Sequence, residues 1–147
     1  MGDPQLKLAR RAMLPAWLRI LACLYHVYLL IPLVFIAGLW APSVTCDTYG
    51  LSYSGPPLAP LALVIGAVQF LHGVAAYGLF WGKSWGPRVA IAACGLGLTI
   101  SLCTFAERGF SDFSVVPFIL AFVLVTLTRV RRRWATCPLE LTADVFA

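Results

Sequence analysis

Four long apolar stretches fill most of the chain, and no Asp, Glu, Lys or Arg interrupts the interior of any of them. They cover residues 18–41, 58–82, 89–106 and 113–128. A hydrocarbon core about 30 Å thick requires about 20 apolar residues at about 1.5 Å of helical rise each, and every stretch is near that length. The pattern predicts an all-α fold, an antiparallel bundle of four transmembrane helices.

The composition leaves no room for a soluble domain. Of 147 residues, 61% are hydrophobic and 12% are charged, and the mean hydropathy is +0.87, far above that of an ordinary soluble protein. We therefore predict a single integral membrane domain over 1–147, with a short basic N-terminal segment at 1–17 and a basic tail at 129–147. Arg outnumbers Lys and Asn is absent, which hints at a GC-rich bacterial genome and hence a multi-pass protein of the bacterial cytoplasmic (inner) membrane.

The basic residues predict the orientation of the chain. All but Arg108 of the 11 Lys and Arg lie in the N-terminal segment and start of the first span, in the 83–88 loop or after the fourth span. The positive-inside rule then places both termini and that loop in the cytoplasm. The net charge of +5 therefore needs no nucleic acid as a partner. The expected partner is the lipid bilayer, with anionic headgroups at a membrane-surface anchor. The arginines of this anchor are Arg10, Arg11, Arg129, Arg131, Arg132 and Arg133.

Three further features of the sequence each predict a local structure. Residues 5–14 form either a basic amphipathic helix on the inner surface or a solvated tail. Pro32, in the middle of the first span, removes a backbone donor and crowds the Tyr28 carbonyl, so a kink is expected. The 42–57 segment is rich in Ser, Thr, Tyr, Gly and Pro, which predicts an outer loop with turns, large enough to contact a partner.

Small residues crowd the second and third spans. They are Ala62, Gly66, Gly73, Ala76 and Gly78 in the second span, and Ala90, Ala93, Gly95 and Gly97 in the third. Small residues let membrane helices approach closely, either within one bundle or between chains. The leading hypothesis is a non-catalytic accessory, assembly or oligomer-forming protein, which contacts a homo-oligomer or a larger membrane complex through these spans and the 42–57 loop.

Two histidines are the only ionisable side chains deep in the spans apart from thiols and tyrosines. His26 and His72 each lie about nine residues, or ~14 Å, from the predicted cytoplasmic boundary. If they face each other they could ligate haem b from both sides, or share a smaller metal or bind another ligand. This gives the alternative of a b-type haem or ligand-binding redox protein. Otherwise each histidine hydrogen-bonds to a backbone carbonyl or a neighbour, and no cofactor is expected.

The cysteines suggest one covalent feature. Cys46 in the outer loop and Cys103 near the outer end of the third span could form a disulfide that pins the loop over the bundle, if their Cα atoms come within about 4.4–6.8 Å. The alternative is two unrelated small residues.

Several known classes of four-span proteins are excluded by their residues. The chain has no C-x-x-C pair of a thiol oxidoreductase and no Glu in the first span, as small multidrug transporters require. It matches four-span glutathione-handling enzymes in size and basic charge, but it lacks their Arg/Glu/Asn-rich second helix. No catalytic residue is therefore assigned. A minimal channel or transporter for a neutral solute is the second alternative, because the spans contain no charge for ion coupling.

Overall fold

The computed structural model describes residues 4–40, 43–108 and 115–143. The structure is mostly helical. Its elements in chain order are α1 (Pro4–Ala12), α2 (Ala16–Tyr25), the 3₁₀ helix η1 (His26–Leu30), α3 (Ile31–Gly38), β1 (Val44–Thr48), β2 (Leu51–Gly55), α4 (Pro60–Phe80), α5 (Gly86–Arg108) and α6 (Val116–Ala143).

Within the described residues, three helical segments are long and apolar enough to cross a membrane: Ala16–Gly38, Pro60–Phe80 and Gly86–Glu107. By length and composition they mark the chain as a membrane protein. They correspond to the first three predicted spans, with ends shifted by a few residues. The predicted start of the fourth span, at 113, lies outside the described residues.

Helix α6 does not end where the fourth apolar stretch ends. It continues from Val116 to Ala143, so much of the predicted tail at 129–147 is helical. Arg, Ala and Leu are good helix formers, and the arginines that follow the apolar stretch therefore prolong the helix. The end of the apolar stretch therefore marks a change in polarity along α6 and not the end of the helix.

The first span is interrupted close to Pro32. Helix α2 ends at Tyr25, five residues adopt the tighter 3₁₀ geometry of η1, and α3 resumes at Ile31. Pro32 occupies the first turn of α3, where its missing N–H costs little. The disturbance predicted from Pro32 thus takes the form of a 3₁₀ segment on its N-terminal side, a common feature at a strained point of a helix.

The prediction of an all-α fold was wrong within the 42–57 segment, where residues 44–55 form an antiparallel β-hairpin in place of an irregular loop. Strand β1 pairs with β2 in a register that sets Val44 opposite Gly55 and Thr48 opposite Leu51. Tyr49 and Gly50 form the turn with φ values of 52° and 87°, as a two-residue hairpin turn of type I′ requires at both positions.

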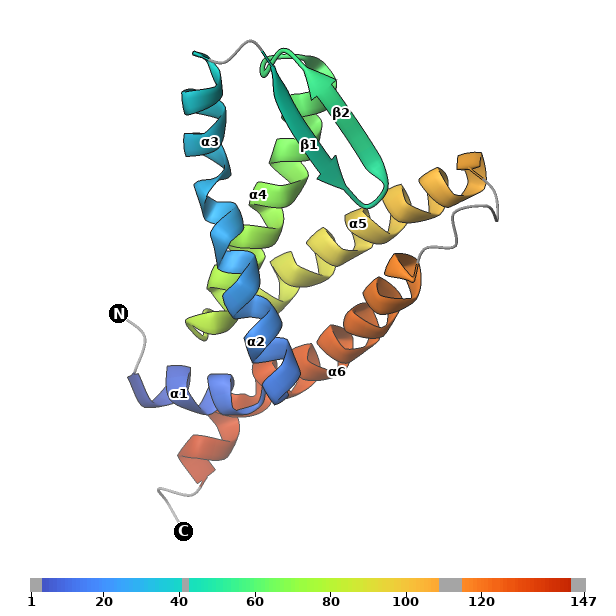
Figure 1. Ribbon diagram of the computed structural model, residues 1–147. Coiled ribbons are helices and arrows are strands. Elements are labelled where there is room, and N and C mark those ends of the chain that lie inside the picture. The colour runs from blue at the N-terminus through green and yellow to red at the C-terminus, as the bar shows by residue number, and fades with distance from the viewer. Residues whose placement is uncertain (1–3, 41–42, 109–114, 144–147) are drawn as a thin grey trace.

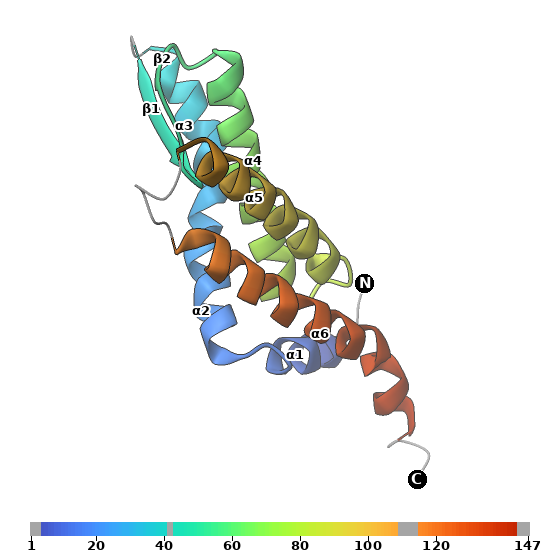
Figure 2. The ribbon, with the colours of Figure 1, turned by 90° about the vertical axis from the view of Figure 1, so that its right-hand side faces the viewer.

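The helices form a forked bundle (Figures 1 and 2). Helix α4 packs against α2, η1 and α3 on one side and against α5 on the other, and α5 packs in turn against α6. The C-terminal end of α3 and the N-terminal end of α6 diverge, and the hairpin turn lies between them near α5. The main core joins residues of α2, α4, α5 and α6 near the opposite end, which includes Leu18, Leu79, Ala93 and Leu127.

Helix α1 lies across the closed end of the bundle (Figure 1). Residues 4–12 are helical, as the first of the two alternatives for residues 5–14 predicted. Its backbone at Lys7 approaches Gly82 so closely that a Cβ on Gly82 would lie 2.7 Å from the Lys7 carbonyl oxygen. The guanidinium of Arg11 lies 4.6 Å from the centre of the Phe80 ring, a cation–π distance.

Candidate functional site

The hairpin turn carries Tyr49 into contact with the helices. The Tyr49 hydroxyl lies 2.7 Å from Nε2 of His72, and the two ring centroids are 5.3 Å apart. A Cβ on Gly97 of α5 would lie 2.8 Å from the Tyr49 ring, so glycine leaves the space that the ring occupies. The Thr104 hydroxyl oxygen lies 3.0 Å from the Tyr49 carbonyl, and its one proton is shared between this carbonyl and the Ile100 and Ser101 carbonyls of its own helix. The turn is therefore in contact with both α4 and α5.

The hydrogen bonds of His72 determine its tautomer. Its Nδ1 lies 2.8 Å from the Val68 carbonyl, which can only accept, so Nδ1 carries the proton. In a neutral imidazole Nε2 is then an acceptor, and the Tyr49 hydroxyl donates to it. Both ring nitrogens are thus engaged, and His72 is 6% exposed.

A second hydrogen bond and the protonation state of Tyr49 also bear on how the hairpin is attached. The Gln69 side-chain amide donates to the Asp47 carbonyl at 2.9 Å, one turn of α4 before His72. Burial raises the pKa of the Tyr49 phenol, and the neighbouring Tyr25 raises it further. Tyr49 therefore keeps the proton that it donates. Together these contacts between uncharged groups attach the hairpin to the bundle. We call the contacts of Tyr49 with His72 and Thr104, and of Gln69 with Asp47, the latch.

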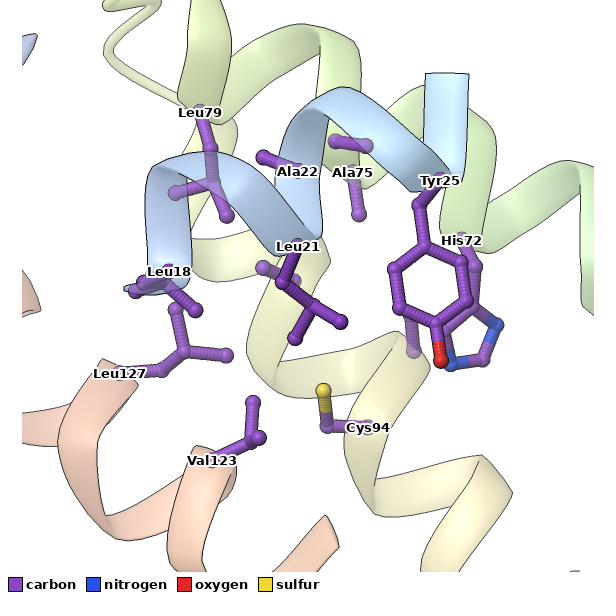
Figure 3. Close-up of a pocket in the computed structure, with 13 residues that line it drawn as sticks. Leu18, Leu21, Ala22, Tyr25, His72, Ala75, Leu79, Cys94, Val123 and Leu127 are labelled. Atoms are coloured by element: carbon purple, nitrogen blue, oxygen red, sulfur yellow. The ribbon is translucent and has the colours of Figure 1, made fainter. Parts of the chain in front are cut away.

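A small apolar cavity of about 40 Å³ lies beside this latch. Figure 3 shows the rings of Tyr25 and His72 side by side at one end of it and Cys94 pointing toward its centre. The ring centroids of Tyr25 and His72 are 5.8 Å apart. The rest of the lining is aliphatic and comes from α2, α4, α5 and α6. The cavity has space for one or two small molecules such as water and is far too small for a haem.

The structure does not bring His26 and His72 together. His26 Nδ1 donates to the Ala22 carbonyl at 2.7 Å, and its ring packs edge-on against Phe80 at 5.1 Å and beside Tyr77 at 6.2 Å. Tyr77 and Phe80 lie more than one helical turn along α4 from His72. The aromatic rings that His26 contacts, Tyr77 and Phe80, therefore differ from those that His72 contacts, Tyr25 and Tyr49.

The physical reason is the direction of helical side chains. Every Cα–Cβ bond tilts toward the N-terminus of its own helix. On antiparallel helices, two side chains at similar depth therefore point apart. His26 points toward the closed end of the bundle and His72 toward the hairpin. Counting residues from the membrane boundary estimates the depth of a Cα atom and misplaces a long side chain by several ångströms.

A haem held by both histidines does not fit this arrangement. Nε2 of His72 already accepts from Tyr49, and the adjoining cavity is small. Each histidine bonds to the carbonyl four residues before it, so the backbone-bonded alternative describes the geometry. Of the four ring nitrogens of the two histidines, Nε2 of His26 is the one that is buried without a hydrogen-bond partner among the described residues. Those residues contain no group of three or more His, Cys, Asp and Glu that could hold a metal ion.

The two cysteines of the predicted disulfide are both free. Cys46 is partly buried in β1, and Cys103 is exposed on α5. The hairpin is instead attached to the bundle by the polar contacts of Tyr49, Gln69 and Thr104, which sequence analysis did not assign. The alternation of VTCDT and LSYSG around Tyr49–Gly50 was the available signal for a hairpin.

The predicted surface arginines are distributed over two elements at the closed end of the bundle. Arg10 and Arg11 lie on α1, and the other four lie on α6. Arg10, Arg131 and Arg132 line one pocket together with Arg88 from the start of α5. Arg129 is exposed on α6 and lies outside this lining.

No family model matches the chain, and comparisons with curated proteins and with solved structures found no similar protein.

Proposed function

We propose that the protein is a four-span integral membrane protein of the bacterial inner membrane with both termini in the cytoplasm. Its role is non-catalytic: it associates with a second copy of itself or with a larger membrane complex. The topology is supported by the gathering of basic residues from α1, the α4–α5 turn and α6 at one end of the bundle, as the positive-inside rule expects of a cytoplasmic face.

Helix α6 has the surface of a fourth span. Its first part, before Arg129, carries the exposed apolar side chains Phe118, Ile119, Phe122 and Val125. Such a surface is costly in water and suited to lipid. Helix α6 packs against α5, and the Phe122 ring lies in a tilted contact with the Trp17 ring at 5.4 Å, so this part of α6 lies beside the start of the first span.

The association face lies on α5. Small residues recur along one side of this helix and face away from the bundle: Ala92, Gly95, Thr99, Cys103 and Ala106. A Cβ on Gly95 would meet nothing within 4 Å, and the Thr99 hydroxyl is satisfied by the Gly95 carbonyl at 3.0 Å. A second membrane helix can therefore approach closely without leaving a polar group unpaired. This open small-residue face is the observation that carries the proposal.

The small residues of α4 serve a different purpose. A Cβ on Gly73 would lie 2.8 Å from the Leu29 backbone nitrogen, and one on Gly66 would lie 2.5 Å from the Phe35 ring. These glycines allow the first span to pack closely within the same chain. Ala90, Ala93 and Gly97 of α5 are likewise buried within the chain, so Gly95 is the one small residue of the predicted α5 set that lies on the association face proposed here.

Native cysteines provide the test. A variant that keeps only Cys103 should form a cross-linked species when membranes are treated with a mild oxidant or a short bifunctional thiol reagent. A variant that keeps only Cys23, exposed on α2, is the matched control and should not. In the Cys103-only chain, Ala92→Leu should reduce cross-linking, whereas Ala37→Leu, at an exposed alanine of α3, should not. A Cys103-only protein that stays monomeric and captures no partner in native membranes would contradict the proposal.

The redox alternative keeps one observation in its favour, the unpartnered Nε2 of His26. A single free nitrogen can bind a haem iron or the polar end of another ligand. An optical spectrum of the protein purified in mild detergent tests the haem version. A Soret band that disappears in His26→Ala would support it over the association proposal.

A further inference from the structure

A pocket of about 710 Å³ lies at the closed end of the bundle, where α1, the α4–α5 turn and α6 meet. Its volume is within the range of about 300–1,000 Å³ that is usual for ligand sites. Nine residues line it: Arg10, Ser84, Pro87, Arg88, Thr128, Arg131, Arg132, Trp134 and Ala135. Four of the nine carry a guanidinium group, and they come from three separate elements.

The positive charge of this pocket has no partner in the lining. No carboxylate lines it, and the acidic residues whose side chains the structure describes, Asp47 and Glu107, lie in the hairpin and near the opposite end of α5. In addition, Nε of Arg10 is buried and has no hydrogen-bond partner among the described residues. A buried unpaired donor on a charged group is costly, and an anion would satisfy it.

The pocket has a fixed wall. Trp134 of α6 is 2% exposed, and its indole N–H donates to the Lys83 carbonyl at 3.2 Å. Pro87, in the first turn of α5, is also fully buried. These contacts attach α6 at Trp134 to the α4–α5 turn, and they hold Arg131 and Arg132 on the side of the pocket that Arg88 also lines.

We propose that this pocket binds the phosphate headgroup of an anionic phospholipid of the inner leaflet. Guanidinium groups match phosphate oxygens in geometry and bind them through charge-assisted hydrogen bonds. The exposed Trp81 and Trp85 near the same turn are the residue type that lies at headgroup depth. That position favours a lipid over a free phosphate compound, because the acyl chains would lie along the exposed apolar surface of the spans. This site differs from a general attraction between basic residues and anionic lipids, because it binds one headgroup at one defined place.

Native mass spectrometry of the full chain in mild detergent tests this, with dioleoylphosphatidylglycerol as the probe. We expect one lipid to bind with preference over dioleoylphosphatidylcholine. Arg131→Gln and Arg10→Gln should each weaken binding about tenfold, the loss expected for one charge-assisted hydrogen bond. Arg129→Gln is the matched control, on the same helix with the same change in charge, and should weaken binding less than twofold. Arg88→Gln, at an exposed position, provides a second variant if Arg10→Gln fails to fold.

Two results would overturn the proposal. Equal weakening by Arg129→Gln and Arg131→Gln would mean that net charge alone attracts lipid and that no site exists. Displacement of the lipid by an equimolar amount of glycerol phosphate or inorganic phosphate would mean that the pocket serves a soluble phosphate compound. Retention of the single bound lipid in the presence of those competitors supports the lipid assignment.

Discussion

Replacing Tyr49 with phenylalanine should destabilise the protein by about 1–2 kcal/mol. The substitution keeps the ring against Gly97 and removes only the hydroxyl that donates to His72 at 2.7 Å. His72 cannot compensate by changing tautomer, because its Nδ1 proton is held by the Val68 carbonyl. Nε2 would therefore be left as a buried unsatisfied acceptor, which costs about 1–3 kcal/mol in soluble proteins. Hydrogen bonds between membrane helices average about 0.6 kcal/mol with a maximum near 1.7, and this places the expectation in the lower half of that range.

The assay is reversible unfolding of the detergent-solubilised chain, followed by circular dichroism. Tyr53→Phe is the matched control, because Tyr53 lies in the same hairpin and its hydroxyl donates to the Pro56 carbonyl at 3.2 Å in an exposed position. We expect Tyr53→Phe to cost less than about 0.5 kcal/mol. A double-mutant cycle with His72→Phe should give a coupling energy of about 1 kcal/mol. Equal losses for Tyr49→Phe and Tyr53→Phe, with no coupling to His72, would refute the latch.

Three further predictions concern the same fold. Gly97→Ala should destabilise the protein by about 1–3 kcal/mol, because the new Cβ would lie 2.8 Å from the Tyr49 ring; Gly95→Ala, which meets open space, should be neutral or slightly stabilising in the same unfolding assay. Trp134→Phe should lower the unfolding temperature, because it leaves a gap and removes the hydrogen bond to the α4–α5 turn, whereas Trp40→Phe, at an 83% exposed position, should not. Because burial raises the pKa of Tyr49, the free energy of unfolding should be insensitive to this group below the unfolded pKa of about 10 and should fall as the pH rises above it; a chain that gains stability there, or a Tyr49→Phe variant with the same alkaline slope, would contradict this.

The positions of the spans were accessible from the sequence because hydropathy and length alone determine where a membrane helix can lie. The first three apolar stretches became Ala16–Gly38, Pro60–Phe80 and Gly86–Glu107. The C-terminal end of α6 could not be predicted in this way, because the residues from Arg129 onward are polar but still helical. Polarity determines where the membrane-embedded part of a helix ends, whereas helix propensity determines where the helix itself ends.

The hairpin was missed although its signal was present. VTCDT and LSYSG flank a two-residue turn ending in glycine, but Ser, Thr and Tyr are equally typical of irregular outer loops. The contacts of Tyr49 with His72 and Thr104, and of Asp47 with Gln69, show that the segment has a fixed partner. Those contacts join positions far apart in the chain, and no local pattern specifies them.

The separation of the two histidine rings could not be predicted from residue counting. His26 and His72 were compared by Cα depth, whereas their rings point in opposite directions along antiparallel helices. The basic pocket was partly accessible, because the arginines of α1 and α6 were assigned to the membrane surface. The convergence of these arginines with Arg88 depends on how α6 packs at Trp134 against the α4–α5 turn, and this requires the tertiary structure.

The Thr104 bond to the Tyr49 carbonyl imposes an order on assembly. Its partners are 55 positions apart, so the hairpin cannot be attached on both sides until α5 has been synthesised and inserted. Helix insertion and helix packing are separable stages in membranes. Before then the hairpin can bond only to α4, through Tyr49 with His72 and through Asp47 with Gln69, and α5 adds the contacts of Gly97 and Thr104 that hold the turn from its second side.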